Sequence, residues 1–168
     1  MLGITSLSLL ARAAPRNKSS SCVTACARYQ LYITIVEARQ LEAMDANGSS
    51  DPYVRCTLDL TGESKETSHQ EKTLNPIFEE DMVFEFEIEN PFALFAASLK
   101  IECMDSDILY DEVIGVFQME LGVVWHKSKD HMLRRQWVAL MDSTLKRPGP
   151  QGSPGRHRLS TLPFAAIP

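Results

Sequence analysis

The stretch Glu79-Glu80-Asp81-Met82-Val83-Phe84-Glu85-Phe86-Glu87-Ile88 alternates between two kinds of side chain. From Met82 to Ile88 every even-numbered residue is apolar, and two of the three residues between them are glutamates. A period of two is typical of a β-strand with one buried face, whereas a helix repeats about every 3.6 residues. The stretch therefore predicts a half-buried strand.

The same period recurs in six further segments, which are separated by turns such as Thr61-Gly62 and Asn75-Pro76. The segments are residues 29–36, 53–60, 63–70, 99–103, 113–121 and 136–141. At most two short helical pieces interrupt them, one at 92–97 and one around Trp125. Many short strands with few helices predict an all-β protein, and an antiparallel β-sandwich fits best.

Composition is that of one ordinary soluble domain. The chain has 168 residues, of which 44% are hydrophobic and 23% charged. No run approaches the roughly 20 apolar residues that a membrane-spanning helix needs. Any membrane contact is therefore expected to be peripheral.

Charge is segregated along the chain. All 22 acidic residues lie between Glu37 and Asp142, while residues 1–28 and 143–168 carry only basic charges. A nucleic-acid partner needs a basic face to neutralise phosphates, so the acidic middle argues against one. It suits cation binding instead.

Two polar loops concentrate the acids. Residues 44–53 read MDANGSSDPY, and residues 104–112 read MDSDILYDE. Carboxylates gathered at one end of a sheet repel one another unless a cation lies between them. Calcium takes about 6 to 8 oxygen ligands in flexible geometry, so it suits such loops.

Both ends of the chain are expected to lie outside the folded unit. Residues 1–28 predict a basic, disordered leader with the composition of a transit peptide. Residues 143–168 are rich in Pro and Gly and predict a disordered tail. Cys56 and Cys103 alternate with apolar residues and are expected to be buried free thiols, and a reducing, cytosolic setting fits the cysteines best.

The motifs resemble, in order and spacing, those of a C2 domain over about residues 29–142. They are Val36–Leu41, then Asp45, Gly48 and Ser50-Asp51-Pro52-Tyr53-Val54, then Lys72–Phe78, and the aspartates before Ile114-Gly115. Residues 113–117 and 133–140 further resemble C2 modules of the ferlins, which act in membrane fusion and repair.

The resemblance implies an eight-stranded Greek-key β-sandwich whose loops bind calcium and then anionic phospholipid. Asp45 and Asp51 would be ligands from the first loop, and Asp105 and Asp107 from the third. Either Asp111 or Glu112 would complete the site, because the third loop is about one residue short of the family pattern.

Calcium would act as an electrostatic switch that cancels repulsion from a negatively charged membrane leaflet. Met44, Ile108, Leu109 and Tyr110 would then enter the membrane interface, unless they pack inward against the sandwich. The expected protein is cytoplasmic, associates peripherally with membranes and serves trafficking, vesicle fusion or repair.

Other functions fit the sequence less well. An EF-hand starting at Asp45 fails, because Ser50 replaces its glycine and Cys56 its bidentate glutamate. No recognisable catalytic motif is present, so an enzyme is not expected. The serious alternative is a calcium-independent C2 module that binds protein partners. Phosphoinositide recognition through Lys65 and Lys72 is weakly supported, because glutamates are interleaved with them.

The eighth strand is not evident from Tyr29 onward. It would come from 23–27 or 157–164, or an edge strand is missing. The Pro/Gly-rich tail then suggests a truncated or alternatively terminated chain with an exposed sheet edge.

Overall fold

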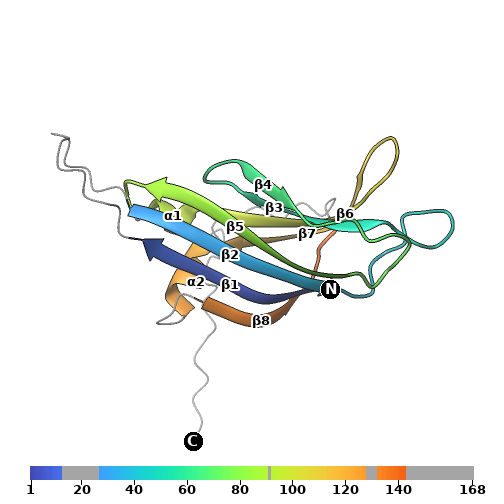
Figure 1. Cartoon of the computed structure of the whole chain (residues 1–168), viewed down its shortest axis with the longest axis horizontal. Coiled ribbons are helices and arrows are strands. Elements are labelled where there is room, and N and C mark those ends of the chain that lie inside the picture. The colour runs from blue at the N-terminus through green and yellow to red at the C-terminus, as the bar shows by residue number, and fades with distance from the viewer. Residues whose placement is uncertain (13–26, 91, 128–131, 143–168) are drawn as a thin grey trace, which may run out of the picture.

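Alternating side chains build two four-stranded antiparallel sheets that pack face to face (Figure 1). The computed structural model describes residues 1–12, 27–90, 92–127 and 132–142. Its elements in chain order are β1 (Leu2–Arg12), β2 (Ala27–Ala38), β3 (Pro52–Leu58), β4 (Glu63–Glu66), β5 (Ile77–Ile88), α1 (Ala93–Ala96), β6 (Ser98–Asp105), β7 (Glu112–Glu120), α2 (Leu121–Lys127) and β8 (Met132–Val138). The strand orders are β5-β2-β1-β8 and β4-β3-β6-β7. The predicted antiparallel β-sandwich is confirmed.

The core lies between the two sheets and uses the faces that the alternation predicted. The buried residues include Leu31, Ile33 and Ile35 of β2, Val54, Cys56 and Leu58 of β3, Met82, Phe84 and Phe86 of β5, and Leu99, Ile101 and Cys103 of β6. Cys56 and Cys103 are free thiols, as expected, and burial raises the pKa of each to about 12. They are therefore inert apolar side chains of the core.

The leader prediction is wrong for residues 2–12. This segment forms β1, which pairs with β2 on one side and with β8 on the other. Leu7 and Leu9 are 1% and 0% exposed in the core, while Leu10 is 45% exposed. The segment therefore belongs to the sandwich, which begins at β1 rather than at Tyr29.

Ser6 and Ser8 of β1 lie on the outer face of the sheet. The hydroxyl groups of Ser6 and Thr34 are hydrogen-bonded at 2.9 Å across the β1–β2 ladder. Ser6-Leu7-Ser8-Leu9 is thus itself a period-two pattern. Because β1 supplies the eighth strand, the described sandwich has no missing edge strand, and the alternatives at 23–27 and 157–164 are not needed.

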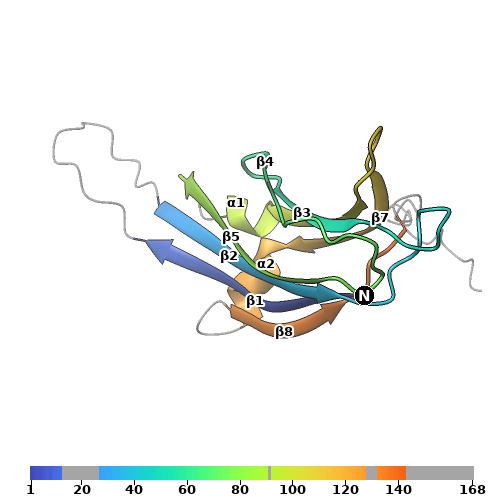
Figure 2. The same ribbon diagram turned by 45° about the vertical axis from the view of Figure 1, so that its right-hand side comes forward.

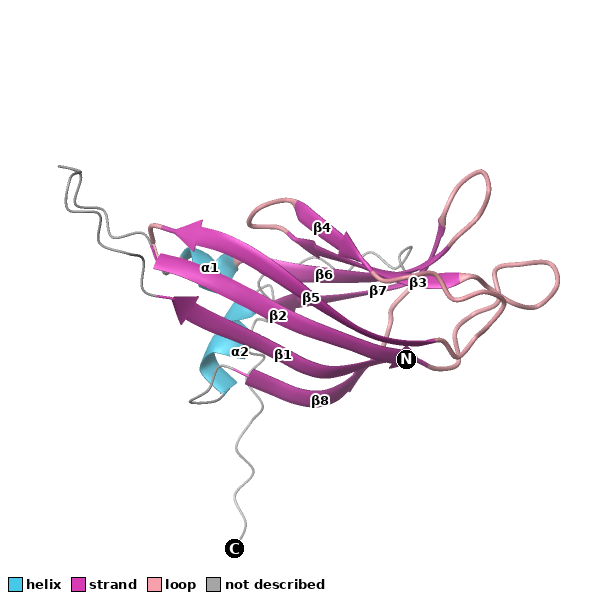
Figure 3. Ribbon diagram, viewed as in Figure 1, coloured by secondary structure: helices cyan, strands magenta, loops and turns pink. Residues whose placement is uncertain are grey.

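Loops and helices occupy opposite ends of the sandwich. Figures 2 and 3 show the loops that follow β2, β4 and β6 together at one end, with α1 and α2 toward the other. The expected edge strand at 63–70 is shorter, since β4 ends at Glu66. Among the described residues, no helix is long and apolar enough to cross a membrane.

Some predictions fall outside the described residues. They concern the rest of the leader at 13–26 and the tail from 143 to 168.

Candidate functional site

Three loops meet at one end of the sandwich. The first loop (39–51) joins β2 to β3, the second loop (67–76) joins β4 to β5, and the third loop (106–111) joins β6 to β7. Figure 1 shows them at the right-hand end, beyond the edges of both sheets. Since Pro52 of β3 pairs with Asp105 of β6, the end of the first loop lies beside the start of the third loop.

Local hydrogen bonds hold the first loop in shape. Gly48 has a φ of +82°, a conformation that favours glycine, and its N–H donates to the carbonyl of Asp45 at 3.0 Å. Ser50 is fully buried, and its hydroxyl accepts from the Met44 N–H and donates to the Glu42 carbonyl. The Ser49 hydroxyl donates to Oδ2 of Asp45 at 3.2 Å. The Asp45 carboxylate is therefore held beside Ser49 within the first loop.

Asp51 connects all three loops. Its backbone N–H donates to Oδ1 of Asp105 at 2.6 Å, and its carbonyl accepts from the N–H of Ser106 at 3.1 Å. Its own Oδ1 accepts from the backbone N–H of Lys72 in the second loop at 2.6 Å. Asp51 and Asp105, both predicted ligands, therefore lie side by side.

The carboxylate of Asp105 lies in unfavourable surroundings. The residue is 1% exposed, and its Oδ2 is buried without a hydrogen-bond partner. Burial raises the pKa of Asp105, and the negative charges of Asp45, Asp107 and Asp51 raise it further. A buried carboxylate oxygen surrounded by other carboxylates is costly unless a cation or a proton joins it.

Asp111 points to different partners. Its Oδ2 accepts from the Tyr53 hydroxyl at 2.7 Å and lies 3.9 Å from a guanidinium nitrogen of Arg55. These contacts lower the pKa of Asp111, with the Tyr53 hydrogen bond as the largest cause. Sequence reasoning missed Tyr53 and Arg55, although their position two residues apart on β3 places both on one face of the sheet. Glu112 is exposed at the start of β7.

The third loop presents its apolar residues to solvent. Ile108, Leu109 and Tyr110 are 102%, 83% and 82% exposed. They do not pack inward, which was the alternative left open by the sequence. Met44 is half-buried, and its backbone N–H is held by Ser50.

The acidic side chains are near one another without forming a closed cage. Among the described residues, no group of three or more His, Cys, Asp or Glu side chains is placed so that it could hold a metal ion. Mutual repulsion of the carboxylates opposes such a closed arrangement in the metal-free chain. The unpartnered Oδ2 of Asp105 nonetheless suits the coordination of a cation, because a buried carboxylate oxygen needs either a positive charge or a hydrogen-bond donor beside it.

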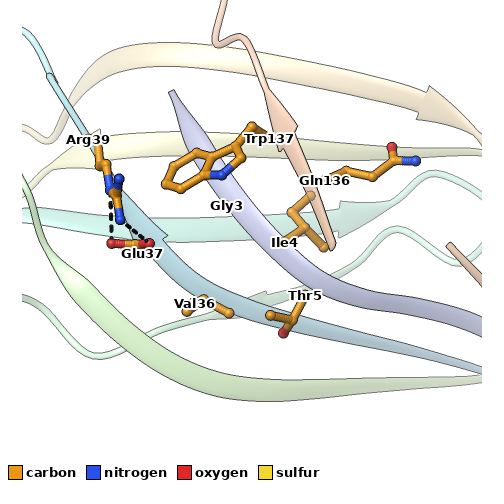
Figure 4. A pocket seen from close by; sticks show the side chains of 8 residues that line it. All are labelled: Gly3, Ile4, Thr5, Val36, Glu37, Arg39, Gln136 and Trp137. Atoms are coloured by element: carbon orange, nitrogen blue, oxygen red, sulfur yellow. Dashed lines mark hydrogen bonds and ion pairs between the residues drawn. The ribbon is translucent and has the colours of Figure 1, made fainter. Parts of the chain in front are cut away.

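A separate hollow of about 320 Å³ lies beside the base of the first loop (Figure 4). The guanidinium of Arg39 stacks over the Trp137 ring at 4.7 Å and also donates to both carboxylate oxygens of Glu37. Trp137 in turn lies against Gly3 of β1. Arg39 and Glu37 are thus already paired with each other. The Arg39–Trp137 contact links the end of β2 to β8, and the contact of Trp137 with Gly3 links β8 to β1.

Comparisons with known proteins agree with this geometry. A family model described as "C2 domain" matches residues 29–140. Human synaptotagmin-9 is 42% identical over 94 residues, which is 54% of this chain and 18% of that protein. Mouse synaptotagmin-6 is 40% identical over 97 residues, or 55% and 18% of the two chains. The chain thus spans less than a fifth of the length of these relatives.

A solved structure extends the likeness to the whole sandwich. A C2 domain of RIM from Drosophila has a TM-score of 0.55 at 18% identity, covering 84% of this chain and 99% of that one. At this identity the likeness concerns the fold alone. These relatives are synaptotagmins and a RIM protein, so the narrower resemblance to ferlin modules stays a prediction. From the family match and the sandwich together, the chain belongs to the C2 domain family.

Proposed function

We propose that this C2 domain binds calcium through Asp45, Asp51, Asp105 and Asp107, and that calcium then docks it on anionic phospholipid membranes. The observation that carries the proposal is the buried Oδ2 of Asp105, which lacks a partner while three other aspartates act on the same carboxylate. A divalent cation with oxygen ligands supplies the missing positive charge.

Charge explains why membrane docking depends on the cation. Without calcium the loop end carries several carboxylates, which a negatively charged leaflet repels. Calcium bound by these residues neutralises them and provides coordination positions for lipid phosphate or carboxylate oxygens. The protein side chains supply the ligands and their placement.

Apolar side chains then add contact area. Ile108 and Leu109 project from the third loop with almost no protein contact, so nothing has to rearrange before they enter the headgroup region. At about 25 cal/mol per Å² of buried apolar surface, the pair contributes a few kcal/mol at most. Met44 is half-buried, so its predicted contribution is smaller.

One set of contacts favours a second candidate, a calcium-independent module that binds protein partners. Asp51, Asp105 and Asp111 each already accept a hydrogen bond from the protein, so the loops are ordered without metal. In either case we place the domain in the cytoplasm, in trafficking, fusion or repair of membranes, and without enzymatic activity.

The test is sedimentation of the chain with phosphatidylserine vesicles, in calcium and in chelator. The variant Asp105→Asn/Asp107→Asn removes two candidate ligands. A matched control is Glu89→Gln/Glu120→Gln, which changes the charge equally by neutralising two exposed acids at the opposite end of the sandwich. We expect calcium-dependent binding that the first variant loses and the control keeps. Binding that ignores calcium would favour the protein-binding module.

A further inference from the structure

The third loop is fastened to the sheet through Asp111. Oδ2 of Asp111 accepts from the Tyr53 hydroxyl at 2.7 Å, and Oδ1 accepts from the Asp107 N–H at 3.3 Å. One oxygen therefore contacts β3 and the other contacts the beginning of the loop. Each carboxylate oxygen of Asp111 thus accepts one hydrogen bond from the protein.

The receiving side of this contact is rigid. Tyr53 is 1% exposed, and its ring stacks on that of His69 with the centroids 4.6 Å apart. Arg55 donates to the Tyr53 hydroxyl at 2.7 Å and is itself fixed by Glu66 of β4 at 2.6 Å. A partner locked by packing and further hydrogen bonds holds a side chain more accurately than a loop residue does.

Asp111 and Asp105 have different neighbours. A guanidinium nitrogen of Arg55 lies 3.9 Å from Oδ2 of Asp111, the same oxygen that accepts from the Tyr53 hydroxyl. Oδ2 of Asp105 is buried without a hydrogen-bond partner. A carboxylate that already has a cationic partner gains less from a calcium ion than one that has none.

Resting on the calcium function proposed above, we infer that Asp111 is not a calcium ligand but a positioning residue that anchors the third loop to Tyr53 and Arg55. Glu112 then takes the remaining ligand position. Glu112 pairs directly with Asp105 in the β6–β7 ladder, so both side chains lie on one face of the sheet.

Calcium titration calorimetry separates the two acids. We expect Glu112→Gln to weaken calcium binding about tenfold or more, because a charged ligand is lost. Asp111→Asn keeps an oxygen for the Tyr53 hydroxyl, and Tyr53→Phe changes no candidate ligand, so each should stay within about threefold of wild type. An Asp111→Asn variant that loses as much affinity as Glu112→Gln would overturn the inference.

A metal-free measurement tests the anchor independently of calcium. In chelator, Tyr53→Phe and Asp111→Ala should each lower the melting temperature. The double variant should lower it little further, because each single variant already removes the hydrogen bond between Tyr53 and Asp111. Asp111→Asn should recover most of the loss seen with Asp111→Ala. Additive losses, or no rescue by asparagine, would overturn the anchor. If the wild type binds no calcium while the losses from Tyr53→Phe and Asp111→Ala remain non-additive, the proposed calcium function is wrong and the anchoring role of Asp111 is retained.

Discussion

The backbone N–H of Asp51 donates to Oδ1 of Asp105 at 2.6 Å, although 54 residues separate the two in sequence. This bond joins the end of the first loop to the end of β6, so the two acidic loops are tied together before any ligand arrives. It also leaves Oδ2 of Asp105 buried and unpartnered. The charge of Asp105 is therefore held in place by a bond that does not neutralise it.

Replacing Asp105 should stabilise the metal-free protein. Asparagine keeps an oxygen for the Asp51 N–H and removes a buried charge that faces three aspartates, so we expect Asp105→Asn to raise the free energy of unfolding by about 1 kcal/mol at pH 7. Urea unfolding in chelator measures this gain. The exposed Asp107 is the control, and Asp107→Asn should change stability much less.

The stability that Asp105→Asn gains over the wild type should shrink on acidification. Because the pKa of Asp105 is raised in the folded protein, folding of the wild type is penalised at neutral pH, and the penalty fades as pH falls through the raised pKa. The difference between Asp105→Asn and wild type should close over that interval. A difference that grows on acidification would contradict this account.

The role of β1 can be tested with two neighbouring leucines. Leu9 is 0% exposed and Leu10 is 45% exposed. We expect Leu9→Ala to cost about 2–5 kcal/mol in urea unfolding, because it leaves a cavity in the core. Leu10→Ala should cost about 0.5 kcal/mol or less. Equal, small effects would mean that residues 2–12 are a leader after all.

Gly115 and Gly3 offer a matched pair for close packing. A Cβ at Gly115 would lie 2.8 Å from the Cβ of Leu140 and 3.3 Å from the carbonyl oxygen of Met141. At Gly3 the nearest atoms would be at 3.4 Å, an ordinary contact. We expect Gly115→Ala to destabilise by about 1–3 kcal/mol and Gly3→Ala by about 0.5 kcal/mol or less, as read from thermal unfolding. The reverse order would show that β7 and the segment after β8 are not in contact.

Sequence alone predicted the strands whose buried face is unbroken. Phe84 and Phe86, or Ile33 and Ile35, repeat at period two because one face of each strand meets the core. The first strand was not predicted, because the basic composition of residues 1–28 is that of a transit peptide. Ser6-Leu7-Ser8-Leu9 does alternate, but this pattern is only four residues long, and irregularities in the pairing with β2 around Ile4 separate it from the start of the strand.

The candidate site was predictable in composition and only partly in geometry. The motif order indicated that Asp51 and Asp105 meet, and the structure brings them together. Whether Asp111 or Glu112 faces the cluster depended on one residue of loop length. In the structure Asp111 contacts Tyr53 and Arg55, which lie more than fifty positions earlier in the chain, so no local sequence pattern could place this side chain.

The tip of the third loop should control affinity for membranes but not for calcium. Ile108→Ser/Leu109→Ser removes two exposed apolar side chains without adding charge. We expect the dissociation constant for phosphatidylserine vesicles in calcium to rise about tenfold, which corresponds to about 1.4 kcal/mol of lost apolar burial. Calorimetry without lipid should show unchanged calcium binding. Phe92→Ser is the control, because Phe92 is 75% exposed at the opposite end of the sandwich. If Phe92→Ser weakens vesicle binding as much as the loop variant does, the membrane contact is not at the third loop.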